Sequence, residues 1–244
     1  MIEDMRDITT SDGAMETFVC HPERGGPYPA IFLLMDAAGI RDELHDMARR
    51  LASAGYYVLV PNLYYRAGRD TKYGADVLEE GSPDNILMRA IRTKMTIPPV
   101  LEDIGAMINF VDRQDRAQDG AVGCHGYCLS GPFALAAAAR FPDRVKAAAS
   151  FHGTWLVNDA EESPHLTFAQ VAGEVYISCA EHDHVAPLDM VDELRGHFEA
   201  AGSPGEIEMN LGVHHGFAFP TRWCYDQPAA ERHWERLFAL YGRL

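Results

Sequence analysis

The chain has 244 residues and is 47% hydrophobic, so it can bury a large core, and we expect one domain over residues 1–244. Its 36 acidic and 21 basic residues give a formal net charge of -15, which would repel nucleic acids and anionic membrane surfaces. The amino terminus is acidic, unlike a signal peptide, and no apolar run approaches the roughly 18 residues of a membrane helix, so we expect a soluble cytoplasmic protein.

The first predicted elements form a βαβ unit. The apolar run at 30–35 is short and continuous, as in a strand that is buried on both faces. Leu44, Met47 and Leu51 follow at helical spacing, and residues 56–61 indicate the next strand. Such a unit places its two strands parallel, with a right-handed crossover between them.

Residues 62–98 interrupt this pattern. They are polar and irregular, apart from a predicted helix that Ser82 and Pro83 open, and a further helix follows Pro99. Because a loop of this length inside a compact fold usually covers a site, we predict that 62–98 is an insertion over the functional site.

Strands and helices alternate over the rest of the chain. Strands are predicted at 121–125, 145–151, 174–180 and 206–211, and helices at 129–141, 189–201 and 228–242. This alternation predicts an α/β fold with a doubly wound, mostly parallel sheet and helices on both faces.

The segment GYCLSG, residues 126–131, joins a predicted strand to a helix and carries Cys128. A nucleophile at such a sharp turn needs small residues two positions before and two positions after it, and here these are Gly126 and Ser130. The amino end of the following helix would stabilise a thiolate. Since a lone cysteine is often only a small buried residue, the prediction that Cys128 is a nucleophile requires partners.

Two later loops at the same edge of the sheet offer an acid and a base, in the order that α/β hydrolases use. The segment AEHDHVAP presents Asp183, which the tight turn before Val185 favours over Glu181. The segment GVHHGFAFP presents His214 and His215, either of which could serve as the base. The three loops together predict a cysteine, histidine and aspartate triad.

The same edge carries several histidines, which could indicate a metal site. They are His125, His182, His184, His214 and His215. The sequence has neither an HExxH motif nor paired cysteines, so we predict no metal and no cofactor.

These segments, together with PNLYYR at 61–66, resemble the dienelactone hydrolase family, the carboxymethylenebutenolidase-like α/β hydrolases. The resemblance runs from about residue 8 to the carboxyl end, and it implies the α/β-hydrolase fold. It also implies that the triad is Cys128, His215 and Asp183. His215 is preferred to His214 because the family's histidine immediately precedes the small residue and the phenylalanine of the HGF unit.

The resemblance assigns three further residues around the thiol. The backbone amides of Ala37 and Leu129 match the family's oxyanion hole. Asp36 matches a carboxylate that takes part in activating the thiol, although aspartate is one methylene shorter than the usual glutamate. A helix N-cap is the alternative interpretation of Asp36.

The resemblance also suggests substrate contacts. The family binds its substrate's carboxylate with arginines, and Arg66 matches one of them, whereas Phe219 stands where the second would be. Tyr64 and Phe217 are additional candidate contacts.

These predictions together describe a hydrolase that cleaves a lactone or an activated carboxylic ester through a thioester on Cys128. Its partner would be a small-molecule substrate, and the protein would be a monomer or a homodimer. Two alternatives stay open, which are a carboxylesterase or thioesterase acting on an unrelated substrate, and an inert binding protein on the same scaffold.

Overall fold

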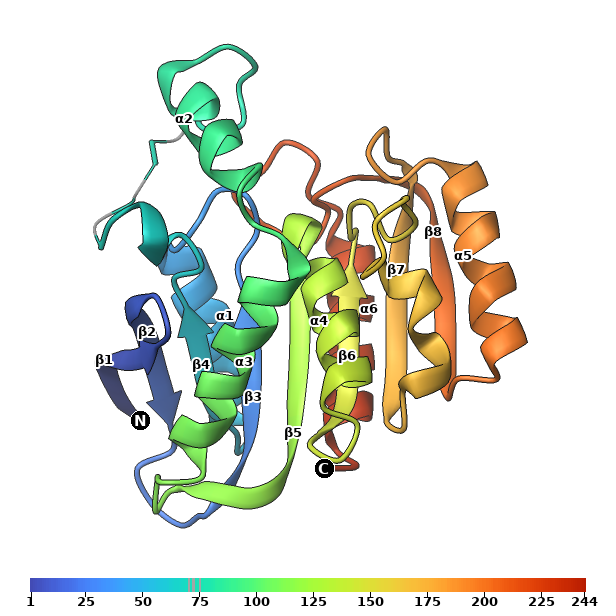
Figure 1. The fold of residues 1–244 in the computed structure, drawn as a ribbon. Helices are drawn as coiled ribbons and strands as arrows, with labels where there is room; N and C mark the ends of the chain where they lie inside the picture. Colours follow the sequence, from blue (N-terminus) through green and yellow to red (C-terminus); the bar gives the residue numbers. More distant parts are fainter. Residues whose placement is uncertain (70, 72, 75) are drawn as a thin grey trace. The chain divides into compact units, whose positions relative to one another are not determined.

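The computed structural model describes residues 1–69, 71, 73–74 and 76–244, and the chain divides into two units, Met1–Asp119 and Gly120–Leu244 (Figure 1). The predicted covering segment 62–98 belongs to the first unit, and its residues 70, 72 and 75 lie outside the described residues. Its covering role and the single domain over 1–244 stay predictions.

Four strands of the first unit lie in the order β1-β2-β4-β3. They are β1 (Ile2–Thr10), β2 (Gly13–His21), β3 (Tyr28–Leu34) and β4 (Tyr57–Pro61). β3 and β4 are parallel, as the βαβ pattern predicts, whereas β1 pairs antiparallel with β2, and β2 pairs antiparallel with β4. The hairpin of β1 and β2 was not predicted, because β1 is exposed over most of its length and therefore lacks an apolar pattern.

The helices of the first unit confirm the predicted positions. α1 (Asp42–Ser53) buries its predicted apolar stripe against β2 and β4. α2 (Pro83–Arg92) begins after Ser82, whose hydroxyl accepts a hydrogen bond from the Asn85 amide at 3.1 Å, so Ser82 is the N-cap. α3 (Ile97–Val111) contacts β1 and lies on the opposite side of the strands from α1 (Figure 1).

The strands of the second unit are all parallel and lie in the order β5-β6-β7-β8. They are β5 (Ala117–Tyr127), β6 (Val145–Phe151), β7 (Glu174–His182) and β8 (Gly205–His214). Parallel strands bring their carboxyl ends to one edge of a sheet. The residues that directly follow these four strands are therefore neighbours in space.

Helices cover both faces of these four strands. α4 (Gly131–Arg140) packs on β6, and α6 (Gln227–Tyr241) packs on β6 and β7 from the other side (Figure 1). α5 (Leu188–Ala201) packs against two short 3-10 helices, η3 (Pro164–Leu166) and η4 (Phe168–Gln170). The alanines of α4 are almost fully buried, which allows the helix to approach the strands closely.

Hydrogen bonds between aromatic and histidine side chains fix α6 beneath the end of β5. The Tyr127 hydroxyl lies 2.6 Å from Nε2 of His233, and the Tyr241 hydroxyl lies 2.8 Å from Nδ1 of His125. All four side chains are buried, so these bonds satisfy polar groups that would otherwise destabilise the core.

The α/β class with mostly parallel strands and covering helices is confirmed. Among the described residues, no helix is both long enough and apolar enough to cross a bilayer.

Candidate active site

The turn after β5 has the sharp geometry that GYCLSG predicts. A short 3-10 helix, η2 (Cys128–Ser130), joins β5 to α4, and Cys128 has a φ of 54°, in the left-handed region. A non-glycine residue in this region stores about 1–3 kcal/mol of strain. The Ser130 hydroxyl accepts a hydrogen bond from the Tyr127 amide at 3.0 Å and donates one to the Tyr127 carbonyl at 3.2 Å, which stabilises the strained turn.

Two glycines make this turn possible because other chain segments approach them closely. A Cβ atom on Gly126 would lie 2.2 Å from the backbone oxygen of Ser130, and one on Gly131 would lie 2.3 Å from the Ser150 hydroxyl. Neither site has room for a side chain. Close contact with the Ser130 backbone therefore requires glycine two positions before Cys128.

Asp183 directly follows β7, and both oxygens of its buried carboxylate are bound. Oδ1 accepts hydrogen bonds from the amides of Val185 at 3.0 Å and Ala186 at 3.2 Å. Oδ2 lies 2.6 Å from Nδ1 of His215. The backbone turn therefore fixes the carboxylate in the orientation in which it binds the imidazole.

His215 directly follows β8 and contacts both Asp183 and Cys128. Burial disfavours its charged form, but the charges of Cys128 and Asp183 and hydrogen bonds to both side chains outweigh burial and raise the pKa of His215 to about 10. Its backbone amide donates to the His182 carbonyl at 3.2 Å. The imidazole is thus held between the sulfur and the carboxylate.

The residue after His215 explains the small position of the HGF unit. Gly216 has a φ of 89°, and a Cβ atom there would lie 2.9 Å from the Arg222 guanidinium and 3.1 Å from the Cys224 sulfur. Both the backbone conformation and the close contacts favour glycine.

The structure distinguishes the two adjacent histidines. The His214 ring is exposed and lies 4.8 Å from the His182 ring and 5.2 Å from the Trp223 ring, measured between centroids. Only His215 of the pair contacts Asp183 among the described residues. The contacts therefore favour the residue that the family resemblance selects.

His152 is a neighbour of the site that sequence reasoning did not select. It directly follows β6, has a φ of 39°, and its ring centroid lies 4.8 Å from that of His215. Burial, followed by the charges of His215 and Arg222, lowers the pKa of His152 well below its usual value, so its imidazole is neutral. The position of SFHG at a strand end could have identified it, by the same rule that identified Asp183.

Asp36 and Ala37, in the first unit, are each held by a neighbouring side chain. Arg41 binds the fully buried Asp36 carboxylate at 2.7 Å and 3.2 Å. The N-cap of α1 is Arg41, so the alternative interpretation of Asp36 as the N-cap is wrong. The Tyr64 hydroxyl donates to the Ala37 carbonyl at 2.9 Å, which orients the peptide that was predicted to carry an oxyanion donor.

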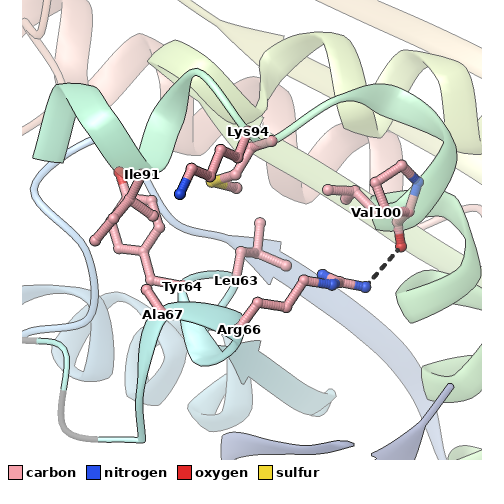
Figure 2. Close-up of a pocket in the computed structure, with 9 residues that line it drawn as sticks. Leu63, Tyr64, Arg66, Ala67, Ile91, Lys94 and Val100 are labelled. Atoms are coloured by element: carbon pink, nitrogen blue, oxygen red, sulfur yellow. Dashed lines mark hydrogen bonds between the residues drawn. The ribbon is translucent and has the colours of Figure 1, made fainter. Parts of the chain in front are cut away.

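Arg66 lies at the wall of a small apolar pocket of about 110 Å³, which Leu63, Tyr64, Ile91 and Val100 also line (Figure 2). Its guanidinium donates to both oxygens of the Asp103 carboxylate at 2.7 Å and 2.9 Å, to Asp12 at 2.6 Å and to the Pro99 carbonyl at 3.3 Å. These bonds join η1 (Tyr65–Ala67) to α3. Arg66 therefore has a structural role, and its predicted contact with substrate stays a prediction.

The remaining predicted residues are buried. Phe217 is fully buried with its ring 5.4 Å from that of His152, so its observed contacts are those of a core residue. Leu129 is buried in η2, directly after Cys128. Substrate contact by Tyr64 and Phe217, and the oxyanion roles of Ala37 and Leu129, stay predictions.

Comparisons with known proteins agree on one family. The model of the dienelactone hydrolase family matches residues 15–244. A protein of Methylorubrum extorquens named "Putative carboxymethylenebutenolidase" is 27% identical over 242 residues, which cover 96% of this chain and 80% of that protein.

Two solved structures share the fold over the whole chain. A "Putative Dienelactone Hydrolase" from Klebsiella pneumoniae has a TM-score of 0.88 at 22% identity, covering 100% of this chain and 99% of that one. A dienelactone hydrolase-like promiscuous phosphotriesterase from metagenomic libraries has a TM-score of 0.77 at 19% identity, with the same coverage. The predicted α/β-hydrolase fold is confirmed.

The turn geometry predicts that Gly126→Ala is severely destabilising. The added methyl group would overlap the Ser130 backbone, so we expect the free energy of unfolding to fall by at least about 3 kcal/mol, measured by urea denaturation. Gly196→Ala is the matched control, since nothing lies within 4 Å of its Cβ position in α5, and it should leave stability unchanged or slightly higher. Equal effects of the two substitutions would show that the turn does not restrict residue 126 to glycine.

The contacts of His215 predict an unusual titration. In NMR spectra of histidine-labelled protein, the wild-type His215 ring should stay protonated at pH 8, and its midpoint should lie near 10. Cys128→Ser removes a negative charge beside the ring, so the midpoint should move to lower pH. The signal is assigned by its loss in His215→Gln. A wild-type midpoint near 6.5, or one that Cys128→Ser leaves unchanged, would show that the sulfur and the ring do not interact.

Proposed function

Because the chain belongs to the dienelactone hydrolase family, we propose that it cleaves a lactone or an activated carboxylic ester through a thioester on Cys128. The observation that carries this proposal is the continuous contact from the Cys128 sulfur through the His215 ring to the buried Asp183 carboxylate. A nucleophile, a base that contacts it and a group that orients the base are the three parts that acyl transfer requires.

The proposed first step is attack by the Cys128 thiolate on the carbonyl carbon. The attraction that keeps a proton on His215 equally favours the thiolate, so the resting site is an ion pair. When the tetrahedral intermediate collapses, the carbon–oxygen bond breaks and the leaving oxygen takes the proton of His215. The acyl group is then a thioester on Cys128.

The proposed second step returns the enzyme to its resting state. Neutral His215 removes a proton from water, and the resulting hydroxide attacks the thioester carbonyl. The carbon–sulfur bond breaks, which releases the acid and restores the thiolate beside the protonated ring. Throughout both steps Asp183 accepts the Nδ1–H hydrogen bond and keeps Nε2 directed at the reacting atoms.

Three further residues would complete the proposed machinery. We propose that the Leu129 and Ala37 amides bind the oxyanion, and the hydrogen bond from Tyr64 supports this role by fixing the Ala37 peptide. Asp36 is the proposed thiol-activating carboxylate, and its ion pair with Arg41 supports the charged form that such a role needs. In the tetrahedral intermediate the leaving group competes with the sulfur for departure, and enolates and phenolates compete well whereas amines compete poorly, so activated esters would be the preferred substrates.

Paired histidine substitutions test the proposed base. With p-nitrophenyl acetate, His215→Ala should lower kcat by about 10² to 10⁴, the range for a general base. His214→Ala, which changes the adjacent exposed ring, should leave kcat near the wild-type value. The same ranking should appear in the rate at which iodoacetamide alkylates Cys128, because His215 contacts the sulfur.

The outcomes separate the alternative functions. Loss of turnover in step with alkylation of one fast-reacting thiol supports the cysteine mechanism. Slow, uniform alkylation of all thiols without hydrolysis would refute it and favour a binding protein. A panel of lactones, aryl esters and thioesters, compared by kcat/KM, then identifies the substrate class.

A further inference from the structure

Three side chains that could bind a metal ion meet on the surface of the second unit, away from the triad residues in sequence. They are His165 of η3 and Glu193 and His197 of α5. Glu193 and His197 are four positions apart and therefore lie on the same side of their helix. One ligand atom from each of the three residues lies within 4.8 Å of the others.

His165 is already oriented as a metal ligand would be. Its side chain is buried, Nδ1 lies 2.7 Å from the Ser163 hydroxyl, and its ring stacks edge to face on His197 at 4.6 Å between centroids. Because Ser163 binds Nδ1, an ion would have to bind at Nε2. Histidine ligands in metal sites almost always have their second ring nitrogen bound in this way.

We propose that His165, Glu193 and His197 bind a zinc ion. Two imidazole nitrogens and one carboxylate oxygen are a donor set that zinc favours, whereas calcium and magnesium prefer oxygen ligands alone. Three protein ligands leave one position of a tetrahedron for water.

Small movements of exposed side chains complete the geometry. Zinc bonds of about 2.0–2.1 Å place tetrahedral ligand atoms about 3.3 Å apart, which is closer than the 4.8 Å limit within which the three atoms lie. Glu193 and His197 are exposed and can rotate toward the buried His165, which stays in place.

The ion would join two segments that flank the proposed triad. The segment between β6 and β7 carries His165 and also Thr154, whose amide donates to the Cys128 carbonyl at 3.1 Å. α5 begins five residues after Asp183. Glu193 also lines an open hollow of about 410 Å³ together with Trp155 and His184, so the ion would lie at its margin. Zinc would thus link the segment between β6 and β7 to α5 and stabilise the second unit.

The test begins with protein that has been stripped with EDTA and titrated with cobalt, a spectroscopic substitute for zinc. We expect one equivalent of cobalt to give the visible bands of a four-coordinate ion, without the near-ultraviolet charge-transfer bands of a cobalt–thiolate bond. Zinc should displace the cobalt and raise Tm in a concentration-dependent manner. Far-ultraviolet circular dichroism serves as the check that each variant is folded.

The variants locate the site. His165→Ala, Glu193→Gln and His197→Ala should each abolish the visible bands, and Ser163→Ala should weaken affinity about tenfold or more. Asp192→Asn, which removes the same charge from the neighbouring position on another side of α5, should bind as wild type. Because Glu193 and His197 are exposed, their variants keep the test valid if His165→Ala fails to fold.

Three results would overturn the proposal. Thiolate bands would place the ion at a cysteine, equal losses in Glu193→Gln and Asp192→Asn would indicate general attraction to acidic surface, and the absence of saturable binding would exclude a site. All three readouts are independent of whether the proposed hydrolase mechanism is correct.

Discussion

The hydrogen bond between Asp183 and His215 is the interaction on which the rest of the site depends. The carboxylate is completely buried, and the backbone amides of Val185 and Ala186 bind its other oxygen. A buried charge that loses its partner costs about 3–5 kcal/mol, so the native structure strongly favours the paired arrangement. This contact therefore helps to hold the loop after β7 and the loop after β8 in register, and it sets the orientation of the His215 ring beside the sulfur.

The strained turn at Cys128 is the second constraint on the site, and hydrogen bonds close to the turn compensate its strain. A positive φ at a non-glycine residue is unfavourable, yet three bonds offset it, namely the two that Ser130 makes with Tyr127 and the one from the Thr154 amide to the Cys128 carbonyl. His152 adds a neutral, buried ring against His215. Because burial lowers the pKa of this neighbour well below its usual value, it restricts the position of the His215 ring without competing for its proton.

Sequence reasoning identified the residues whose positions a local sequence pattern predicts. Cys128, Asp183 and His215 each follow a recognisable strand, and the common edge of parallel strands places such positions together, so the structure brings together the three that were predicted. The β1–β2 hairpin was missed because a strand exposed on both sides leaves no apolar periodicity. The bonds of Arg66 to Asp103 and of Asp36 to Arg41 could not be foreseen, since which charge pairs with which depends on side-chain directions that spacing does not encode.

The residues proposed for the reaction come from both units of the chain. The proposed nucleophile, base and orienting acid all lie within Gly120–Leu244, whereas Asp36 and Ala37 lie within Met1–Asp119. Reactivity of the thiol toward a small alkylating agent would depend on the proposed triad and on Asp36, the proposed thiol-activating carboxylate, but not on the amides of Ala37 and Leu129, because alkylation develops no oxyanion. Hydrolysis of an ester would depend on all of these groups, because a tetrahedral intermediate needs donors for its oxygen. A substitution that leaves alkylation intact and removes turnover would therefore implicate oxyanion stabilisation, and one that removes both would implicate the pairing of sulfur, imidazole and carboxylate.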